Sequence, residues 1–391
     1  MAKTEIPCRG LVLAGGGARG SYQVGVWRAL EELGWRPRII TGTSVGCLNG
    51  AMFAMDLYET ARDMWLTIRS RDVMELPEQD ADRTALHGFL REVVREGGLD
   101  VSPLEEIVER VLDEDALRAA PIRFGLVTVE SRGLKARELP LEEIPPGRVK
   151  DYLLASAACF PALRAREIDG VKFLDGGYSD NMPMGLAQRM GAQELVCVDL
   201  EGIGITRPNR TGLPTTLIRS AWELGDILHF DPDTARRNME LGYFDTLRAF
   251  GRIRGCAYAI DNEGRSAADA EAFAARFEAV QQAVREKYPA ATLTSSAALA
   301  LANMQDRALA PLEAAAQDAG VDPTRYYTVD SLGEAFAAAC DRSRIEGFAP
   351  LFEGTGSAAL AARATLMPNT FLQALVFRAI TDPAIPEVTT Q

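Results

Sequence analysis

Short apolar runs alternate with longer amphipathic stretches in the first half of the chain, and this alternation constrains the fold more than any other feature of the sequence. Buried strands are expected at 10–15 and 37–42, each followed by a helix, at about 21–33 and 44–55. The run at 194–200 is apolar on both faces, as a central parallel strand is. Alternating strands and helices predict an α/β layered fold.

Three further segments complete this half of the chain. Residues 122–131 are expected to form a strand, and 166–177 to form a hairpin that turns at Asp169 and Gly170. Charged helices are expected to fill about 59–112.

The second half has a different character, which begins after a loop-like stretch at 202–212 that contains Gly, Pro and Asn. From about 215 onward the chain is rich in alanine and mostly helical in period, with one strand-like piece at 255–260. We therefore expect a catalytic or binding domain at 9–205 and a mainly helical C-terminal region at 215–391.

The charge balance excludes some classes of partner. The formal net charge is −13, from 42 Lys and Arg against 55 Asp and Glu. Nucleic-acid binding requires clustered basic residues for phosphate contacts, so no nucleic-acid partner is expected. The same balance argues against general electrostatic adhesion to anionic lipid.

The cysteines and the apolar runs point to a cytoplasmic protein. Six cysteines are scattered without a CxxC pair, which predicts reduced thiols rather than a zinc site or a disulfide framework. No apolar run approaches the ~20 residues that span a bilayer, and residues 1–10 lack a signal-peptide stretch.

A glycine loop, spaced Gly15-x-Gly17-x-x-Gly20, ends the first expected strand. A dinucleotide site would require a carboxylate at the end of the second strand, where Thr41 and Gly42 stand instead. A Walker-type phosphate loop fails as well, because no GK[ST] follows the glycines. The loop therefore either serves another negative charge or is a tight turn without a ligand.

A second motif explains the first. Residues 42–46 read Gly-Thr-Ser-Val-Gly between a strand and a helix, the pattern of a nucleophile elbow with Ser44 exposed at its tip. A serine that attacks a carbonyl needs backbone N–H groups aimed at the developing oxyanion. The amides of Gly16 and Gly17 are candidates for these donors, and Arg19 either holds the loop or adds positive potential.

Ser44 also needs a base, for which three residues are candidates. His87 lies in a charged helical segment and is expected to be a surface or packing histidine. His229 follows every candidate acid, in the Ser…Asp…His order of α/β-hydrolases. Asp175 ends a strand directly before Gly176 and is either a base or an Asp-Gly turn without chemistry. A carboxylate near its usual pKa of about 4 is a weak base, so Asp175 would have to be partly desolvated.

Several separate segments, in this order along the chain, resemble the bacterial patatin-like phospholipase family over roughly residues 9–200. The matching segments are Gly15–Gly20, Gly42–Gly46, the stretch 155–161, Asp175-Gly176-Gly177 and Asn181-x-Pro183. Residues 242–250 also look like a segment of some bacterial members. The stretch 155–161 departs from the family pattern, because it lacks the Pro-Gly pair that many relatives carry there.

The resemblance implies a three-layer fold with a mainly parallel central sheet flanked by helices. It implies a Ser–Asp dyad with Ser44 as nucleophile and Asp175 as proton acceptor. It also implies an oxyanion hole at Gly15, Gly16, Gly17 and Arg19.

The activity implied is hydrolysis of fatty-acyl esters of phospholipids, lysophospholipids or related lipids through an acyl-enzyme. This chemistry needs neither a metal nor an organic cofactor, and calcium is not implied. The expected partners are a lipid or ester substrate and, transiently, a membrane surface, for a cytoplasmic protein that is peripheral to the membrane.

Two other functions stay open at this stage, as does the role of the C-terminal region. One is a non-catalytic lipid-binding or regulatory module on the same fold, and the other is a small-ester hydrolase with a triad that uses His229. The region 215–391 would be accessory, a lid or packing. Its segment 366–380 would lie in a membrane interface, cover the acyl pocket or pack as an ordinary helix.

Overall fold

The computed structural model describes residues 7–75, 98–263, 265–293, 301, 304 and 306–382. Contacts within the chain divide it into two units, Met1–Ala249 and Phe250–Gln391, which are described separately below.

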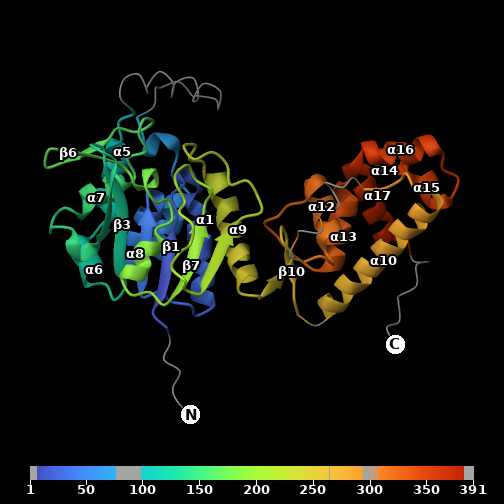
Figure 1. Ribbon diagram of the computed structural model, residues 1–391, viewed down its shortest axis with the longest axis horizontal. Helices are drawn as coiled ribbons and strands as arrows, with labels where there is room; N and C mark the ends of the chain where they lie inside the picture. Colours follow the sequence, from blue (N-terminus) through green and yellow to red (C-terminus); the bar gives the residue numbers. More distant parts are fainter. Residues whose placement is uncertain are drawn as a thin grey trace, which may run out of the picture. The chain divides into compact units, whose positions relative to one another are not determined.

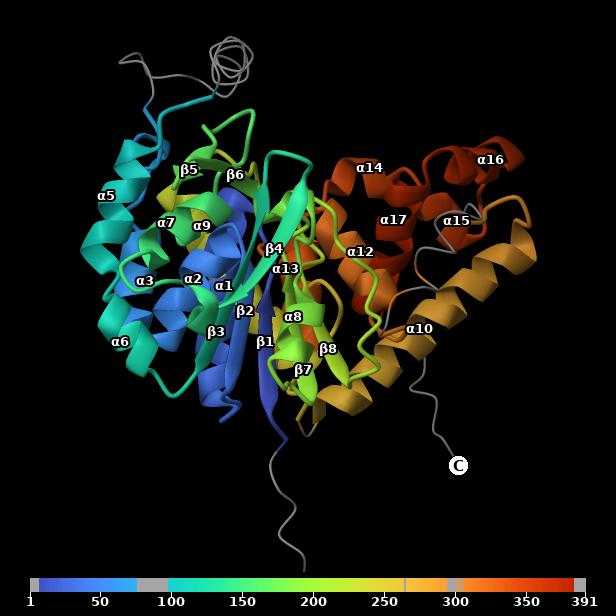
Figure 2. The same cartoon turned by 60° about the vertical axis from the view of Figure 1, so that its left-hand side comes forward.

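The first unit is built on a mixed, mostly parallel sheet of eight strands (Figures 1 and 2). The strands run in the order β5-β6-β3-β2-β1-β7-β8, and β4 pairs antiparallel with β3. The neighbours from β3 to β8 along this order are parallel, whereas β6 is antiparallel to both β3 and β5. The strand bounds are β1 Arg9–Leu13, β2 Ile39–Thr43, β3 Arg123–Glu130, β4 Lys135–Pro140, β5 Arg166–Ile168, β6 Val171–Asp175, β7 Glu194–Asp199 and β8 Thr215–Arg219.

Helices cover both faces of this sheet. They are α1 Ser21–Glu32, α2 Val45–Ala54, α3 Tyr58–Trp65, α5 Ser102–Val111, α6 Glu114–Ala119, α7 Val149–Ser156, α8 Met184–Arg189 and α9 Pro232–Ala249. Successive residues of a strand point to opposite faces. Gly50 of α2 lies against Leu13 and Ile40, whereas their neighbours Val12 and Ile39 cluster with α8. The two helices are therefore on opposite faces, which confirms the three-layer α/β fold.

The local predictions for this unit largely hold. Asp169 and Gly170 both adopt positive φ, 49° and 78°, and join β5 to β6 as the predicted hairpin. Strand β7 lies between β1 and β8 and is buried along almost its whole length, as predicted for a central strand. The expected charged helices of 59–112 include α3 and α5, and the part at 76–97 lies outside the described residues.

The predicted boundary at 205–215 lies too early in the chain, and residues 215–219 form a strand rather than a helix. β8 pairs with β7 in the main sheet, and α9 packs on α1. A Cβ added at Gly25 of α1 would sit 1.8 Å from a backbone oxygen of α9, so only glycine allows this approach. The sequence did not predict β8, because it is a short, largely exposed edge strand in which only Ile218 is buried.

The second unit is mainly helical, as predicted. Its helices are α10 Arg265–Lys287, α12 Ala310–Asp318, α13 Val329–Ala339, α14 Arg342–Glu346, α15 Ala349–Glu353, α16 Ala358–Leu366 and α17 Pro368–Thr381. A small sheet of β9 Ile253–Arg254, β10 Ala259–Asp261 and β11 Tyr326–Tyr327 accompanies them, with β10 in the expected strand region.

Helix α17 contains most of the segment 366–380 and packs as an ordinary helix. It contacts α10, α12, α14 and α16 within its own unit. Phe371, Leu372, Leu375 and Val376 are all buried, so these side chains are not available to a membrane interface. In the part of the chain that the structure describes, no helix combines the length and the apolar character needed to cross a membrane.

Candidate active site

Ser44 occupies a sharp turn between β2 and α2. Its backbone has φ 54° and ψ −130°, a conformation that a residue other than glycine rarely adopts. The flanking glycines make the turn possible: a Cβ at Gly42 would lie 2.4 Å from the backbone of Gly46, and one at Gly46 would lie 2.2 Å from the carbonyl oxygen of Leu13. Residues 42–46 thus form a sharp strand-to-helix elbow with Ser44 at its tip.

A hydrogen-bonded serine supports the elbow from behind. The backbone N–H of Ser44 donates to Oγ of Ser156 at 3.0 Å, and that hydroxyl donates to the carbonyl oxygen of Val127 at 2.6 Å. Ser156 is fully buried, at the end of α7. The sequence analysis assigned it no role, although it lies in the stretch 155–161 that resembles the family.

Asp175 lies at the end of β6 and meets Ser44. The Ser44 side chain lies close enough to its carboxylate to lower the pKa of Asp175, and the N–H of Gly177 donates to Oδ1 at 2.7 Å. The side chain is buried, with 6% of its surface exposed. Burial raises the pKa of Asp175 to about 6, against the opposite effect of Ser44 and of the Gly177 N–H.

The glycine loop places two backbone amides beside these side chains. Among the described residues, none accepts a hydrogen bond from the N–H of Gly16 or of Gly17, and both glycines line the same pocket as Ser44 and Asp175. Gly17 has φ +54°, and a Cβ there would lie 2.0 Å from the carbonyl oxygen of Ile227. The loop can therefore present two donors to an anionic oxygen.

Gly15 and Arg19 have supporting roles in the loop. The N–H of Gly15 donates to the Asn181 carbonyl at 3.2 Å, and the Asn181 side-chain amide donates to the Gly15 carbonyl at 3.1 Å. Arg19 donates to the backbone carbonyls of Gly225, Leu200 and Glu201. The Arg19 guanidinium therefore holds loops together, which is the first of the two roles expected for it.

The structure does not bring His229 to the nucleophile. Among the described residues, the Asp175 carboxylate accepts a hydrogen bond from the N–H of Gly177 and none from His229. His229 is half-buried in a loop whose neighbours Leu228 and Phe230 line the pocket, but its own side chain does not line it. His87 lies outside the described residues.

Ser44 and Asp175 open into a long apolar pocket. Its walls come from α2, α3, α5 and α7, which gather on one side of the sheet (Figure 2), and from adjoining loops. The apolar side chains that the first three helices contribute include Leu48, Met52, Met64, Trp65, Leu104, Ile107, Val108 and Val111. Such a pocket suits a hydrocarbon chain attached to the group that reacts at Ser44.

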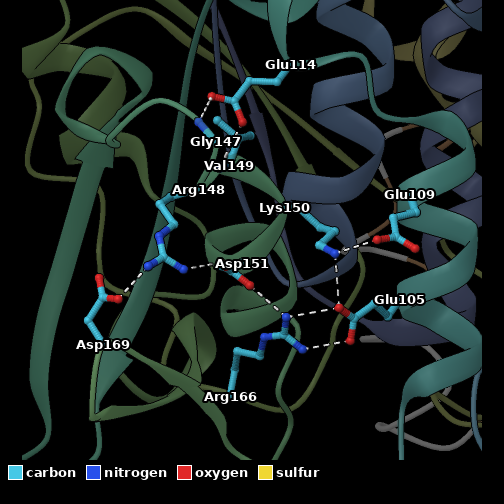
Figure 3. A network of polar contacts seen from close by, with 10 residues as sticks. All are labelled: Glu105, Glu109, Glu114, Gly147, Arg148, Val149, Lys150, Asp151, Arg166 and Asp169. Carbon is cyan, nitrogen blue, oxygen red and sulfur yellow. Dashed lines mark hydrogen bonds and ion pairs between the residues drawn. The ribbon is translucent and has the colours of Figure 1, made fainter.

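Ion pairs hold one wall of this pocket in place (Figure 3). Glu105 of α5 accepts two hydrogen bonds from Arg166 of β5, at 2.8 and 3.1 Å, and also pairs with Lys150 of α7 at 3.2 Å. Arg166 pairs in turn with Asp151 at 2.6 Å, and Lys150 with Glu109 at 2.7 Å. The charged face of α5 is thus tied to α7 and β5, while its apolar face lines the pocket.

Comparison with known proteins matches the first unit to the family that its sequence motifs resemble. Residues 11–187 match the family model described as patatin-like phospholipase. The chain is 29% identical over 269 residues to lysophospholipase nte1 of Aspergillus terreus and 30% identical over 267 residues to lysophospholipase NTE1 of Phaeosphaeria nodorum. Each alignment covers 64% of this chain and 16% of the fungal protein, so the chain spans about a sixth of the length of these curated relatives.

A solved structure, that of VipD from Legionella pneumophila, aligns with 99% of this chain and 94% of its own, at 14% identity and a TM-score of 0.40. That alignment is too loose to inform the site. The layered sheet and the match over residues 11–187 are the stronger findings. The first unit therefore has the patatin-like α/β fold, and its residues 11–187 are similar to the patatin-like phospholipase family.

Proposed function

We propose that this chain hydrolyses fatty-acyl ester bonds of lipids through an acyl-enzyme on Ser44, with Asp175 as the base. One observation carries the proposal: Ser44 and the buried carboxylate of Asp175 line the polar end of the same apolar pocket. The amides of Gly16 and Gly17, at the same end, supply donors for the oxyanion. The matching fungal proteins are named lysophospholipases, which supports phospholipids and lysophospholipids as the substrate class.

In the proposed reaction, Asp175 takes the proton of the Ser44 hydroxyl as Oγ attacks the ester carbonyl carbon. The tetrahedral oxyanion accepts hydrogen bonds from Gly16 and Gly17, and each such donor contributes about 3 kcal/mol in the transition state. The C–O bond to the alcohol then breaks, and the alcohol leaves with the proton from Asp175. Water, deprotonated by the same carboxylate, attacks the acyl carbonyl carbon. The C–O bond to Ser44 then breaks, Oγ takes the proton back from Asp175, and the fatty acid is released.

Burial of Asp175 makes the carboxylate a stronger base than a solvated aspartate. With a pKa of about 6, it is ionised at neutral pH and still accepts a proton more readily than a carboxylate near 4. The nucleophile, the base and the two amides supply every group that the reaction uses, so neither a metal nor an organic cofactor is part of the proposal.

The proposal includes transient contact with a membrane surface, for a cytoplasmic enzyme. Ile203 is 78% exposed and also lines the pocket, and Ile205, two residues later, is 56% exposed. The backbone N–H of Ile205 donates to the carbonyl of Gly177, beside Asp175, at 2.8 Å. Apolar side chains exposed at the entrance of a lipid pocket favour contact with the aggregate that supplies the lipid. The likeness of 242–250 to bacterial members stays a prediction.

Covalent labelling with a fluorophosphonate, followed by intact mass, tests the proposal. The full chain is compared with Ser44→Ala, Asp175→Asn and His229→Ala. A single adduct is expected on the wild type and on His229→Ala, none on Ser44→Ala, and a weak signal on Asp175→Asn. Lipid panels then report which acyl esters are cleaved.

Other outcomes would assign the chain differently. Loss of labelling by orders of magnitude in His229→Ala would establish a triad and remove Asp175 as the direct base. A folded wild type that stays unlabelled but binds lipid vesicles would make the chain a non-catalytic lipid-binding module on this fold.

A further inference from the structure

The apolar pocket follows one face of α2 from the reactive serine to Met55, the residue directly after the helix. Ser44, Leu48, Met52 and Met55 all line it, at the spacing that places residues on one helical face. With a rise of about 1.5 Å per residue, this face is about 16 Å long from Ser44 to Met55. Any chain that leaves the ester at Ser44 along the pocket therefore runs beside α2 for about that distance.

The polar groups of the pocket are confined to its Ser44 end. Asp175 and Asn181 lie there, as does the glycine loop. Asn49, which also lines the pocket, is fully occupied: its amide nitrogen donates to the carbonyl of Gly20 and to Gln23, and its oxygen accepts from Trp65. Beyond Ser44 the wall thus offers hydrocarbon contacts, as an unbranched acyl chain requires.

Helix α5 forms the wall on another side, where ion pairs hold it. Leu104, Ile107, Val108 and Val111 line the pocket at intervals of three, one and three residues, again one helical face. The opposite face is held by the ion pairs of Glu105 and Glu109. While these ion pairs are intact, the second wall gives the pocket a defined width along α2.

We propose that α2 sets the acyl-chain length, with Met55 as a specificity determinant. This inference deepens the proposed function and rests on it, since an acyl chain reaches the pocket through reaction at Ser44. The α2 face from Ser44 to Met55 is ~16 Å long, as given by the helical rise. An extended alkyl chain advances roughly 1.25 Å per carbon, so about twelve carbons span this face. The substrate class is then an ester of an unbranched acyl chain of about this length. Further carbons gain no contact along α2.

The test uses alkyl fluorophosphonates whose chain on phosphorus varies from about four to about sixteen carbons, at nanomolar concentrations of probe. Ser44 attacks phosphorus and fluoride leaves, so the second-order labelling rate reports how the chain fits. Each methylene buried should raise the rate about fourfold until the chain reaches Met55, after which the rate should level off.

The break is the chain length at which the labelling rate levels off. Two substitutions at Met55 should move this break in opposite directions. Met55→Trp fills the end of the pocket and should shift the break to chains about four carbons shorter. Labelling by the longest probes should then fall at least tenfold relative to the shortest. Met55→Ala opens the end and should move the break toward longer chains. Leu217→Trp, on the exposed face of β8, is the matched control and should leave the profile unchanged.

Each result decides between the two proposals. Labelling that does not depend on chain length, or a break that both Met55 variants leave in place, overturns the length determinant and leaves the acyl hydrolase intact. Absence of labelling at every chain length in the folded wild type overturns the hydrolase, and the length determinant with it. Circular dichroism of each variant confirms that a shifted profile comes from a folded protein.

Discussion

The pocket has two kinds of wall, and they are held by different forces. At the reactive end, Gly42, Gly46 and Gly176 bring backbone atoms so close that no side chain fits between them. At the α5 wall, side-chain ion pairs between partly exposed groups fix the helix. Close packing of the backbone is insensitive to changes in salt concentration and pH. Ion pairs near the surface are weakened by high salt and by a pH that neutralises one partner. The chemistry is thus placed on rigid elements and the hydrocarbon wall on adjustable ones.

The largest expected effect comes from breaking the backbone packing. Gly46→Ala places a Cβ 2.2 Å from the Leu13 carbonyl oxygen and should destabilise the protein by about 3 kcal/mol, with loss of labelling at Ser44. Gly185→Ala, in α8, meets nothing nearer than 3.6 Å and is the matched control. Chemical denaturation of both variants checks the difference. A Gly46→Ala protein as stable as the control would contradict the rigid reactive wall.

The second effect concerns the buried carboxylate and has opposite signs for rate and stability. Because Asp175 must be ionised, kcat/KM should fall as the pH drops through about 6. The folded-state pKa lies above the unfolded value of about 4, so the ionised group destabilises the fold above about pH 6, and this penalty disappears between about pH 6 and 4.

Asp175→Asn should therefore be more stable than the wild type by about 3 kcal/mol at about pH 8, and by much less at about pH 4. Urea denaturation at the two pH values measures this. Asp180, whose pKa is also raised to about 6 by burial, has the same sign for stability. Asp180→Asn should leave the pH dependence of the rate in place. If it moves that profile instead, the assignment of the rate-controlling pKa to Asp175 is wrong.

A smaller effect is expected behind the elbow. Ser156→Ala removes the acceptor of the Ser44 N–H and the donor to the Val127 carbonyl, and should cost about 1–2 kcal/mol. Labelling should slow about tenfold, because the Ser44 backbone loses a fixed contact, with the pH profile unchanged. Ser156→Thr, which keeps the hydroxyl, should recover part of the rate. Equal rates for wild type and Ser156→Ala would show that the glycines alone hold the elbow.

The smallest effect tests the other wall. Arg166→Ala removes the pairs to Glu105 and Asp151, and should cost about 1 kcal/mol because these groups are partly exposed. Labelling by long alkyl probes should fall severalfold relative to short ones, and high salt should produce the same trend in the wild type. Arg236→Ala, which breaks an exposed pair with Asp233, serves as the control. Salt-independent chain selectivity would contradict an adjustable wall.

The sequence was most informative where geometry leaves one choice of residue. Glycines at 42, 46 and 176 are required by backbone contacts that any Cβ would block, so their spacing predicts the elbow and the turn after Asp175. The strands that carry these turns are buried and apolar, which made the layered fold predictable as well.

The sequence did not predict the roles of residues whose partners are distant along the chain. Ser156 and Arg166 look like ordinary polar residues until the fold places them against Ser44 and Glu105. Strand β8 could not be identified from its pattern, because an edge strand with one buried residue lacks a clear alternation. The burial of α17 likewise depends on helices distant in sequence.

The strained backbone conformation of Ser44 affects how residue 44 is expected to change in evolution. A non-glycine residue in this conformation costs about 1–3 kcal/mol, which Ser44→Gly would largely relieve. Stability alone therefore favours glycine at this position, and only selection for hydrolysis opposes it. A descendant freed from that selection would drift toward glycine at position 44 and become more stable as it lost its chemistry.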